Sequence, residues 1–304
     1  MRKISLLLLF VLAFACPATA QMTGYSIRID TGLVTTFSCD EHGDLDCFRY
    51  RTELGTIDSD FSDGTSAATT LAPSGELVVL DQYAFREFRL DWHHLPSLDV
   101  VSSLHLVGEP QWVTDFAFGP DLTLWLTGVP ENGTGTSLYT VDQATGEATE
   151  VWNQDLWFIS IAFVDDRMFL MADSLLLEFD PVTGTAREVA DYYWPGPYGG
   201  TTQYVPSLSS YDDRLWSLSF IPSYPPGPDS PTMLGTHDME NGDHDVLVGD
   251  FDWATSQGSI WWTLDLVDSP EQQPAAIPMI GRYGLAILVG LIGFVGVFLV
   301  RRAF

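Results

Sequence analysis

Apolar and polar positions repeat through the middle of the chain with a period of about 45 residues. Turns that lead into short apolar strands end at Leu77, Leu124, Met168, Leu215 and Ile260, so the spacings are 47, 44, 47 and 45 residues. Within these strands apolar residues alternate or run together, as in FAF at 116–118. Such short patterns are typical of stacked, half-buried β-sheets.

A second hairpin recurs behind the first in several repeats. It is a strand that ends in Asp, followed four residues later by Gly, as at Asp142 and Gly146, Asp180 and Gly184, and Asp238 and Gly242. Two hairpins per repeat of this length predict an all-β fold, a β-propeller of about five blades.

The last repeat, at Ile260, lacks an outer hairpin of its own. Residues 25–37 near the N-terminus, YSIRIDTGLVTTF, resemble the outer hairpins of the other repeats. We therefore expect N-terminal strands to supply the outer hairpin of the last blade and close the ring, which would protect its open edges.

Both ends of the chain carry targeting patterns. Residues 1–20 combine Arg2 and Lys3 with an apolar stretch and a small-residue site at 18–20, which predicts a secretory signal peptide. A lipoprotein signal cleaved at Cys16 is the alternative. At the other end, residues 283–300 are 18 uncharged residues, about 27 Å of helix and enough to span a membrane. Export of the ectodomain, residues 21–267, follows from this arrangement, with residues 268–276 as a polar linker.

The C-terminal segment 277–304 has a recognisable order: IPMIGRYG, an apolar span and two arginines. It resembles the IPTL-CTERM sorting tail, in which Ile-Pro-Thr-Leu, two variable residues and Trp-Gly precede a membrane helix. The resemblance implies processing by an exosortase-type protease, with the protein anchored in the inner membrane first and at the cell surface or outside the cell afterwards. An anchor that is never processed is the alternative. The residues that carry the resemblance are Ile277, Pro278, Ile280, Tyr283, Gly284, Arg301 and Arg302.

Charge is distributed very unevenly. All 41 acidic residues lie between the signal and the tail, together with eight arginines and no lysine, so the exported part has a formal charge of −33. Such a surface repels nucleic acid and anionic lipid, which excludes both as partners of the ectodomain. It suits a saline habitat, divalent cations or a cationic partner.

Two local features have two interpretations each. Cys39 and Cys47 bracket DEHGDLD, and in an exported chain a local disulfide is favoured over a metal site. The acid-rich segment 238–245 has the oxygen-rich composition of a calcium loop. It also aligns with the hairpin turns and contains Asn-Gly, a pair typical of tight turns. A turn is favoured there, and calcium is the alternative, with Asp238, Glu240, Asp243 and Asp245 as candidate ligands.

Candidate ligand-binding residues come where each inner strand should begin. Three aromatic residues lie 11 or 12 residues ahead of their repeat anchors, with acids or amides just before them, and a further acid lies near the fifth repeat. Aromatic faces beside carboxylates suit a sugar or a cationic ligand, although repeated aromatics could instead pack neighbouring blades together. These candidates are Trp112, Trp157, Tyr204, Glu109, Asp155 and Asp250.

No catalytic signature is present: the chain lacks G-x-S-x-G, H-E-x-x-H, a P-loop and G-x-G-x-x-G. The favoured interpretation is an exported, surface-sorted propeller that binds a glycan, a matrix polymer or another surface protein without catalysis. One alternative is a metal-dependent propeller hydrolase or lactonase, with Asp155, Glu109 and Asp250 converging on a metal ion. Another is a structural surface component with no defined ligand.

Overall fold

The computed structural model describes residues 21–28, 32–40, 52–57, 68–84, 86–108, 110–131, 134–172, 175–194, 201–202, 204–220, 232–249 and 265–268. These residues form strands and turns, with no helix among them. The strands are β1 (Gln21–Arg28), β2 (Leu33–Asp40), β3 (Thr52–Thr56), β4 (Thr69–Leu71), β5 (Leu77–Ala84), β6 (Glu87–His94), β7 (Asp99–His105), β8 (Val107–Gly108), β9 (Pro110–Phe118), β10 (Leu124–Pro130), β11 (Thr136–Val141), β12 (Glu147–Gln154), β13 (Phe158–Val164), β14 (Arg167–Ala172), β15 (Leu175–Asp180), β16 (Thr185–Asp191), β17 (Tyr193–Trp194), β18 (Thr201–Thr202), β19 (Tyr204–Tyr211), β20 (Arg214–Phe220), β21 (Thr232–His237), β22 (His244–Gly249) and β23 (Asp265–Asp268).

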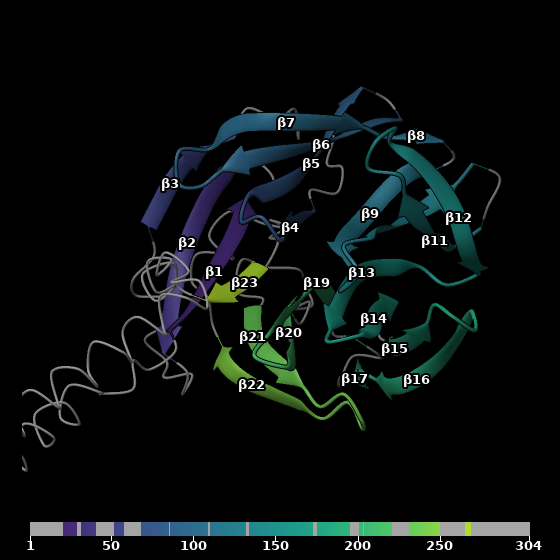
Figure 1. Ribbon diagram of the computed structural model, residues 1–304. Helices are drawn as coiled ribbons and strands as arrows, with labels where there is room; N and C mark the ends of the chain where they lie inside the picture. The colour runs from purple at the N-terminus through teal and green to yellow at the C-terminus, as the bar shows by residue number, and fades with distance from the viewer. Residues whose placement is uncertain are drawn as a thin grey trace, which may run out of the picture. The chain divides into compact units, whose positions relative to one another are not determined.

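Five sheets of the unit 19–267 are arranged around a ring as the blades of a β-propeller (Figure 1). The first blade is β4–β7, the second β9–β12, the third β13–β16 and the fourth β19–β22, and β23, β1, β2 and β3 form the closing blade. The predicted all-β, five-bladed propeller is therefore confirmed. In addition, β8 pairs in parallel with the outer edge of β12, and β17 pairs with β18.

Closure by N-terminal strands is confirmed, but the predicted place of the N-terminal hairpin was wrong. The sheet order β23-β1-β2-β3 makes the β1–β2 hairpin the middle of the closing blade rather than its outer hairpin. The outer strand is β3, a short and mostly exposed TELGT segment without apolar alternation. Such a segment carries no hydrophobic periodicity from which a strand could be predicted. Cys39 lies on β2 opposite Met22, so its predicted partner Cys47 falls in the β2–β3 connection.

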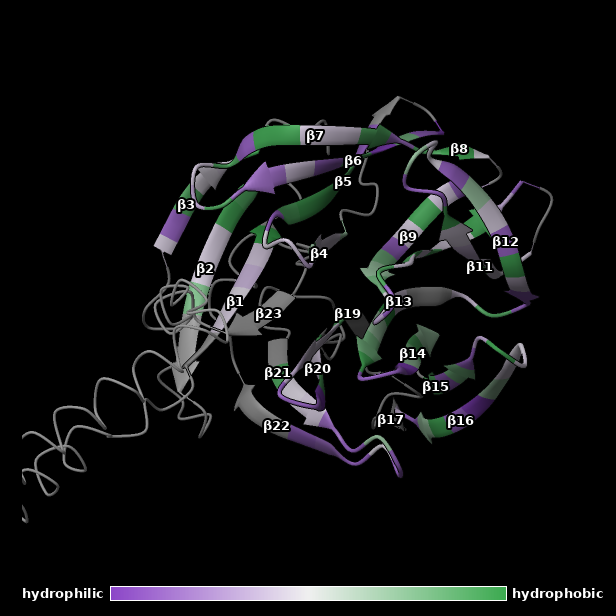
Figure 2. Cartoon of the chain, in the orientation of Figure 1, coloured by the Kyte–Doolittle hydropathy of each residue, from purple (hydrophilic) through white to green (hydrophobic). Residues whose placement is uncertain are grey.

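Apolar cores fill the spaces between consecutive blades. Along β5, Val78 and Leu80 pack towards the second blade, whereas Leu77 and Val79 pack towards the closing blade. The third blade repeats this alternation along β14, because Leu170 faces the second blade whereas its neighbours Phe169 and Met171 face the fourth. Both β5 and β14 are thus apolar on their two faces, which explains the continuous apolar runs of these strands in the sequence. Figure 2 shows this contrast between hydrophobic β5 and the more hydrophilic outer strands such as β12.

Counted from the centre of the ring, the fourth strand of every described blade carries one extra residue relative to the third. Such a β-bulge leaves the extra residue unpaired and increases the local twist of the strand. Bulged edges are poor templates for pairing with another chain, so the rim of the ring is protected against edge-to-edge association. The extra residues are all Val or Leu: Leu54, Val101, Val151, Val189 and Leu247.

The antiparallel order of strands gives the ring two distinct faces. We call the face at which the innermost strands β4, β9, β13 and β19 begin the start face, and the opposite one the turn face. The turn face carries the first hairpin turn of each of the first four blades and the Asp-to-Gly turns predicted from the sequence. In each of these, the Gly amide donates to the Asp carbonyl oxygen with a Gly φ between 67° and 78°, at Asp142–Gly146, Asp180–Gly184 and Asp238–Gly242.

Several predicted features lie outside the described residues. They include the signal peptide 1–20, the sorting tail 277–304 with its span at 283–300, and the residues Cys47, Glu109 and Asp250. The linker 268–276 also lies outside, except for Asp268, which is the last residue of β23. Within the described part, no helix of membrane-spanning length and apolarity occurs. These features stay predictions.

Candidate binding surface on the start face

The three candidate aromatic residues occupy related places at the start face. Trp112 is the third residue of β9, Trp157 directly precedes β13, and Tyr204 is the first residue of β19. Each therefore stands where an innermost strand begins, in three consecutive blades.

Their environments differ. Trp157 is 52% exposed. The other tryptophans whose side chains the structure describes are buried or partly buried. Trp112 is partly buried on β9, opposite Val129 of β10. Of Trp112 and Trp157, Trp157 is therefore the ring that is more accessible to a large ligand.

The loop between β10 and β11 fixes the segment that carries Asp155 and Trp157. The Thr136 amide donates to the Leu156 carbonyl oxygen over 2.8 Å, and the Thr134 hydroxyl donates to Asp155 Oδ1 over 2.8 Å. Gly135 lies between them with a φ of 91°, and a Cβ there would lie 2.3 Å from the carbonyl oxygen of Gln154. Only glycine tolerates both that backbone conformation and that contact.

The same loop also contacts the first and second blades. The side-chain Nε2 of Gln111 donates to the Glu131 carbonyl oxygen over 2.6 Å. Arg86, from the β5–β6 hairpin, lies 3.8 Å from the Glu131 carboxylate, and the two side chains are 45% and 62% exposed. Sequence reasoning missed Arg86, Glu131 and Thr134, although ENGTG at 131–135 is a strong turn signal.

A cavity of about 170 Å³ lies between the innermost strands β4, β9, β13 and β19. Its one lining carboxylate among the described residues is Asp115, which is 8% exposed. Asp115 Oδ2 accepts from the Ser160 hydroxyl (2.5 Å) and the Ile161 amide (3.0 Å), and Oδ1 accepts from the Phe116 amide (2.9 Å). Ser160 in turn accepts from the Leu208 amide, so the network joins the second, third and fourth blades.

This arrangement gives Asp115 a structural role. A buried carboxylate is stable when several hydrogen bonds compensate its lost hydration, and here three donors do so. Of the carboxylates expected to converge on a metal ion, Asp155 is exposed and held by Thr134, while Glu109 and Asp250 lie outside the described residues. The described cavity therefore does not bring several carboxylates together.

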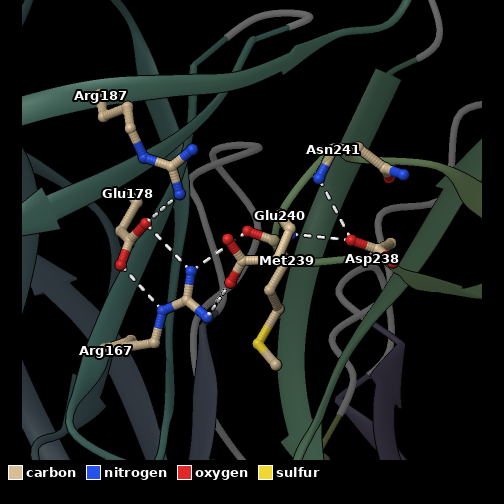
Figure 3. A network of polar contacts seen from close by, with 7 residues as sticks. All are labelled: Arg167, Glu178, Arg187, Asp238, Met239, Glu240 and Asn241. Atoms are coloured by element: carbon tan, nitrogen blue, oxygen red, sulfur yellow. Dashed lines mark hydrogen bonds and ion pairs between the residues drawn. The ribbon is translucent and has the colours of Figure 1, made fainter.

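The acid-rich segment 238–245 forms a capped turn on the turn face (Figure 3). Asp238 Oδ1 accepts from the amides of Glu240 (2.8 Å) and Asn241 (3.1 Å). Glu240 lies 2.9 Å from Arg167, whose guanidinium also binds Glu178 and holds the pKa of that carboxyl below its usual range. Asp243 and Asp245 are both exposed, and Asp243 contacts the Asn241 side chain.

The geometry of this segment agrees with the turn interpretation. Within the described chain, no group of three or more His, Cys, Asp or Glu side chains is arranged to hold a metal ion. Calcium binding stays a prediction.

A buried polar cluster supports this turn from beneath. The Tyr192 hydroxyl donates to the Gly242 carbonyl oxygen (2.8 Å), so its oxygen accepts the proton on His237 Nδ1 (2.6 Å). His237 Nε2 then accepts from the Ser217 hydroxyl (2.6 Å). Burial, with a smaller effect from nearby His244, lowers the pKa of His237 to about 3. The cluster is thus built for a neutral imidazole.

Comparison with known proteins gives likenesses of fold. No family model matches the chain, and no curated protein matches it. A putative exo-beta-1,3-galactanase from Bifidobacterium bifidum s17 is similar with a TM-score of 0.49 and 12% identity, covering 75% of this chain and 87% of that one. A putative gluconolactonase has a TM-score of 0.42 and 12% identity over 76% of this chain and 91% of that one. A puromycin hydrolase mutant complexed with PGG has a TM-score of 0.43 and 16% identity over 71% of this chain, which spans only 35% of that one.

Proposed function

We propose that this protein is an exported, non-catalytic binding module, sorted to the cell surface through its C-terminal tail, that captures a glycan on the start face of the propeller. The observation that carries the proposal is the exposure of Trp157, 52%, on a segment held rigid by the β10–β11 loop. Sugar rings stack on exposed aromatic faces, and neighbouring carboxylate and amide groups supply directed hydrogen bonds.

The polar groups around Trp157 fit this role. Asn153, Gln154 and Asp155 precede it and are all exposed, so the segment that carries the ring also carries exposed acceptors and donors. Because Thr134 and Gly135 hold this segment in place, little conformational entropy is lost when a ligand binds.

A glycan array probed with the full chain, followed by calorimetric titration of the best ligand, tests the proposal. Trp157→Ala should weaken binding about tenfold or more, the loss expected when a stacking contact of about 1.5 kcal/mol is removed. Val182→Ala is the matched control, because Val182 is 92% exposed on the turn face.

Two results would contradict the proposal. One is unchanged affinity of Trp157→Ala for every glycan that the wild type binds. The other is cooperative unfolding of that variant at a much lower temperature, which would mean that Trp157 packs the blades together instead of binding a ligand.

A further inference from the structure

The carboxylate of Asp155 is held in one orientation. Its Oδ1 accepts the Thr134 hydroxyl over 2.8 Å. Among the described residues no donor engages Oδ2, and the side chain is exposed. One oxygen therefore fixes the group, and the other is available to a donor on a ligand.

No described cation neutralises this group. A cation–carboxylate contact at this face joins Arg86 and Glu131, at 3.8 Å between two exposed side chains. A pair of that kind is screened by solvent and leaves Glu131 largely hydrated. The start face around the second blade therefore presents Asp155 and Glu131 as exposed acids.

The whole exported part adds to this local charge. With a formal charge of −33, it attracts cations and repels anions at separations comparable with the Debye length, about 8 Å at physiological ionic strength. An acidic polysaccharide would be repelled as it approached Trp157, whereas a glycan with ammonium groups would be attracted.

The contacts at close range select for the same chemistry. An ammonium group donates charge-assisted hydrogen bonds to a carboxylate, and these are roughly twice as strong as neutral ones. A cation near an indole face gains a further cation–π attraction. Trp157 and Asp155 are two residues apart on one fixed segment, so one amino sugar could engage both.

We propose that the ligand of the start face is an amino-sugar polymer that carries free ammonium groups, with Trp157 stacking on the sugar ring and Asp155 binding its ammonium group. This inference rests on the proposed function, since it specifies the class of glycan. It assigns Asp155 as the residue that determines specificity and Thr134 as the residue that positions it.

The test is calorimetric titration of the full chain with oligomers of equal length made of glucosamine, of N-acetylglucosamine and of a uronic acid. We expect the glucosamine oligomer to bind at least about tenfold more tightly than its acetylated counterpart, the factor for about one charge-assisted contact. The uronic acid oligomer should not bind. The preference should shrink at high salt, because exposed charges are screened there.

Asp155→Asn should abolish the preference for glucosamine while the acetylated oligomer still binds, and Asp180→Asn on the turn face is the matched control. Equal affinity for the charged and acetylated oligomers, with binding still dependent on Trp157, would overturn this inference alone. Failure of all three oligomers and of the array to bind would overturn the proposed function as well.

Discussion

The two faces of the propeller use the same residue types in opposite ways. On the turn face, both carboxylate oxygens of Asp180 accept hydrogen bonds within its own turn. Oδ1 accepts from the Val182 and Thr183 amides, and Oδ2 accepts from the Thr183 hydroxyl. That hydroxyl holds the pKa of Asp180 below its ordinary value. On the start face, Asp155 accepts one hydrogen bond from Thr134 in the described structure.

The apolar residues show the same division. Val182, 92% exposed, lies in a turn where both carboxylate oxygens of Asp180 already accept hydrogen bonds. Trp157, 52% exposed, lies two residues after Asp155, whose Oδ2 accepts none among the described residues. An exposed apolar residue by itself says little about function. An exposed aromatic ring on a fixed segment, beside polar groups with unused hydrogen-bonding capacity, supports the binding site that we propose.

The two faces should respond very differently to alanine in place of glycine. Gly135→Ala should destabilise the fold by about 4 kcal/mol, because left-handed backbone strain adds to overpacking against the next segment. Its φ is 91° and its Cβ would lie 2.8 Å from the Cα of Asp155. Gly184→Ala should cost only about 1 kcal/mol, since its φ is 67° but nothing lies within 4 Å. Urea unfolding of both variants measures the difference, and equal costs would show that the start-face loop is not tightly packed.

Acid should weaken the turn face through His237. Its pKa is about 3 in the folded protein and about 6.5 in an unfolded chain. The unfolded state therefore takes up the proton first as the pH falls. The stabilisation from the neutral imidazole is complete above about pH 6.5 and is lost progressively towards pH 3. The loss should be roughly 3 kcal/mol near pH 4.5.

The previous blade provides the matched variant for this prediction. In the third blade Phe179 pairs with Met168, which is the position that His237 occupies opposite Leu215 in the fourth. Phe179 packs against Trp152 with ring centroids 4.7 Å apart. His237→Phe should therefore fold at neutral pH and lose less stability in acid than the wild type. Thermal melts across this pH range measure the effect, with exposed His94→Gln as the control. Parallel pH curves for the wild type and His237→Phe would contradict the assignment.

Removing one turn cap should have the smallest effect. Asp238→Ala loses two backbone donors to Oδ1 and should cost about 1 kcal/mol, while Asp238→Asn keeps the acceptor and should cost less. Neither should change glycan affinity, because the turn lies on the other face. A loss of affinity in Asp238→Ala at full folding would place the binding surface on the turn face instead.

Local patterns explain what the sequence could predict. Turn residues such as Asp180 and Gly184, and the apolar strands that begin near Leu77 and Leu124, recur at a fixed spacing, so the blades and their number were recognisable. The outer strand β3 was not, because it is polar and exposed. The Asp115–Ser160 bond spans 45 residues, about one repeat, and depends on which blades are neighbours.

The start face was only partly predictable for the same reason. Spacing placed Trp112 and Trp157 at related positions, but burial separates them, and burial depends on side chains from other strands. The bond from Thr134 to Asp155 joins a loop to a connector 21 residues away, which no local pattern marks.

Hydrogen exchange of the full chain with and without the glucosamine oligomer tests the central claim, binding on the start face, most directly. The account predicts slower amide exchange at residues 134–136 and 154–157 when the ligand is present, with no change at the turns 181–184 and 238–243. Protection confined to those turns, or spread evenly over all blades, would contradict it.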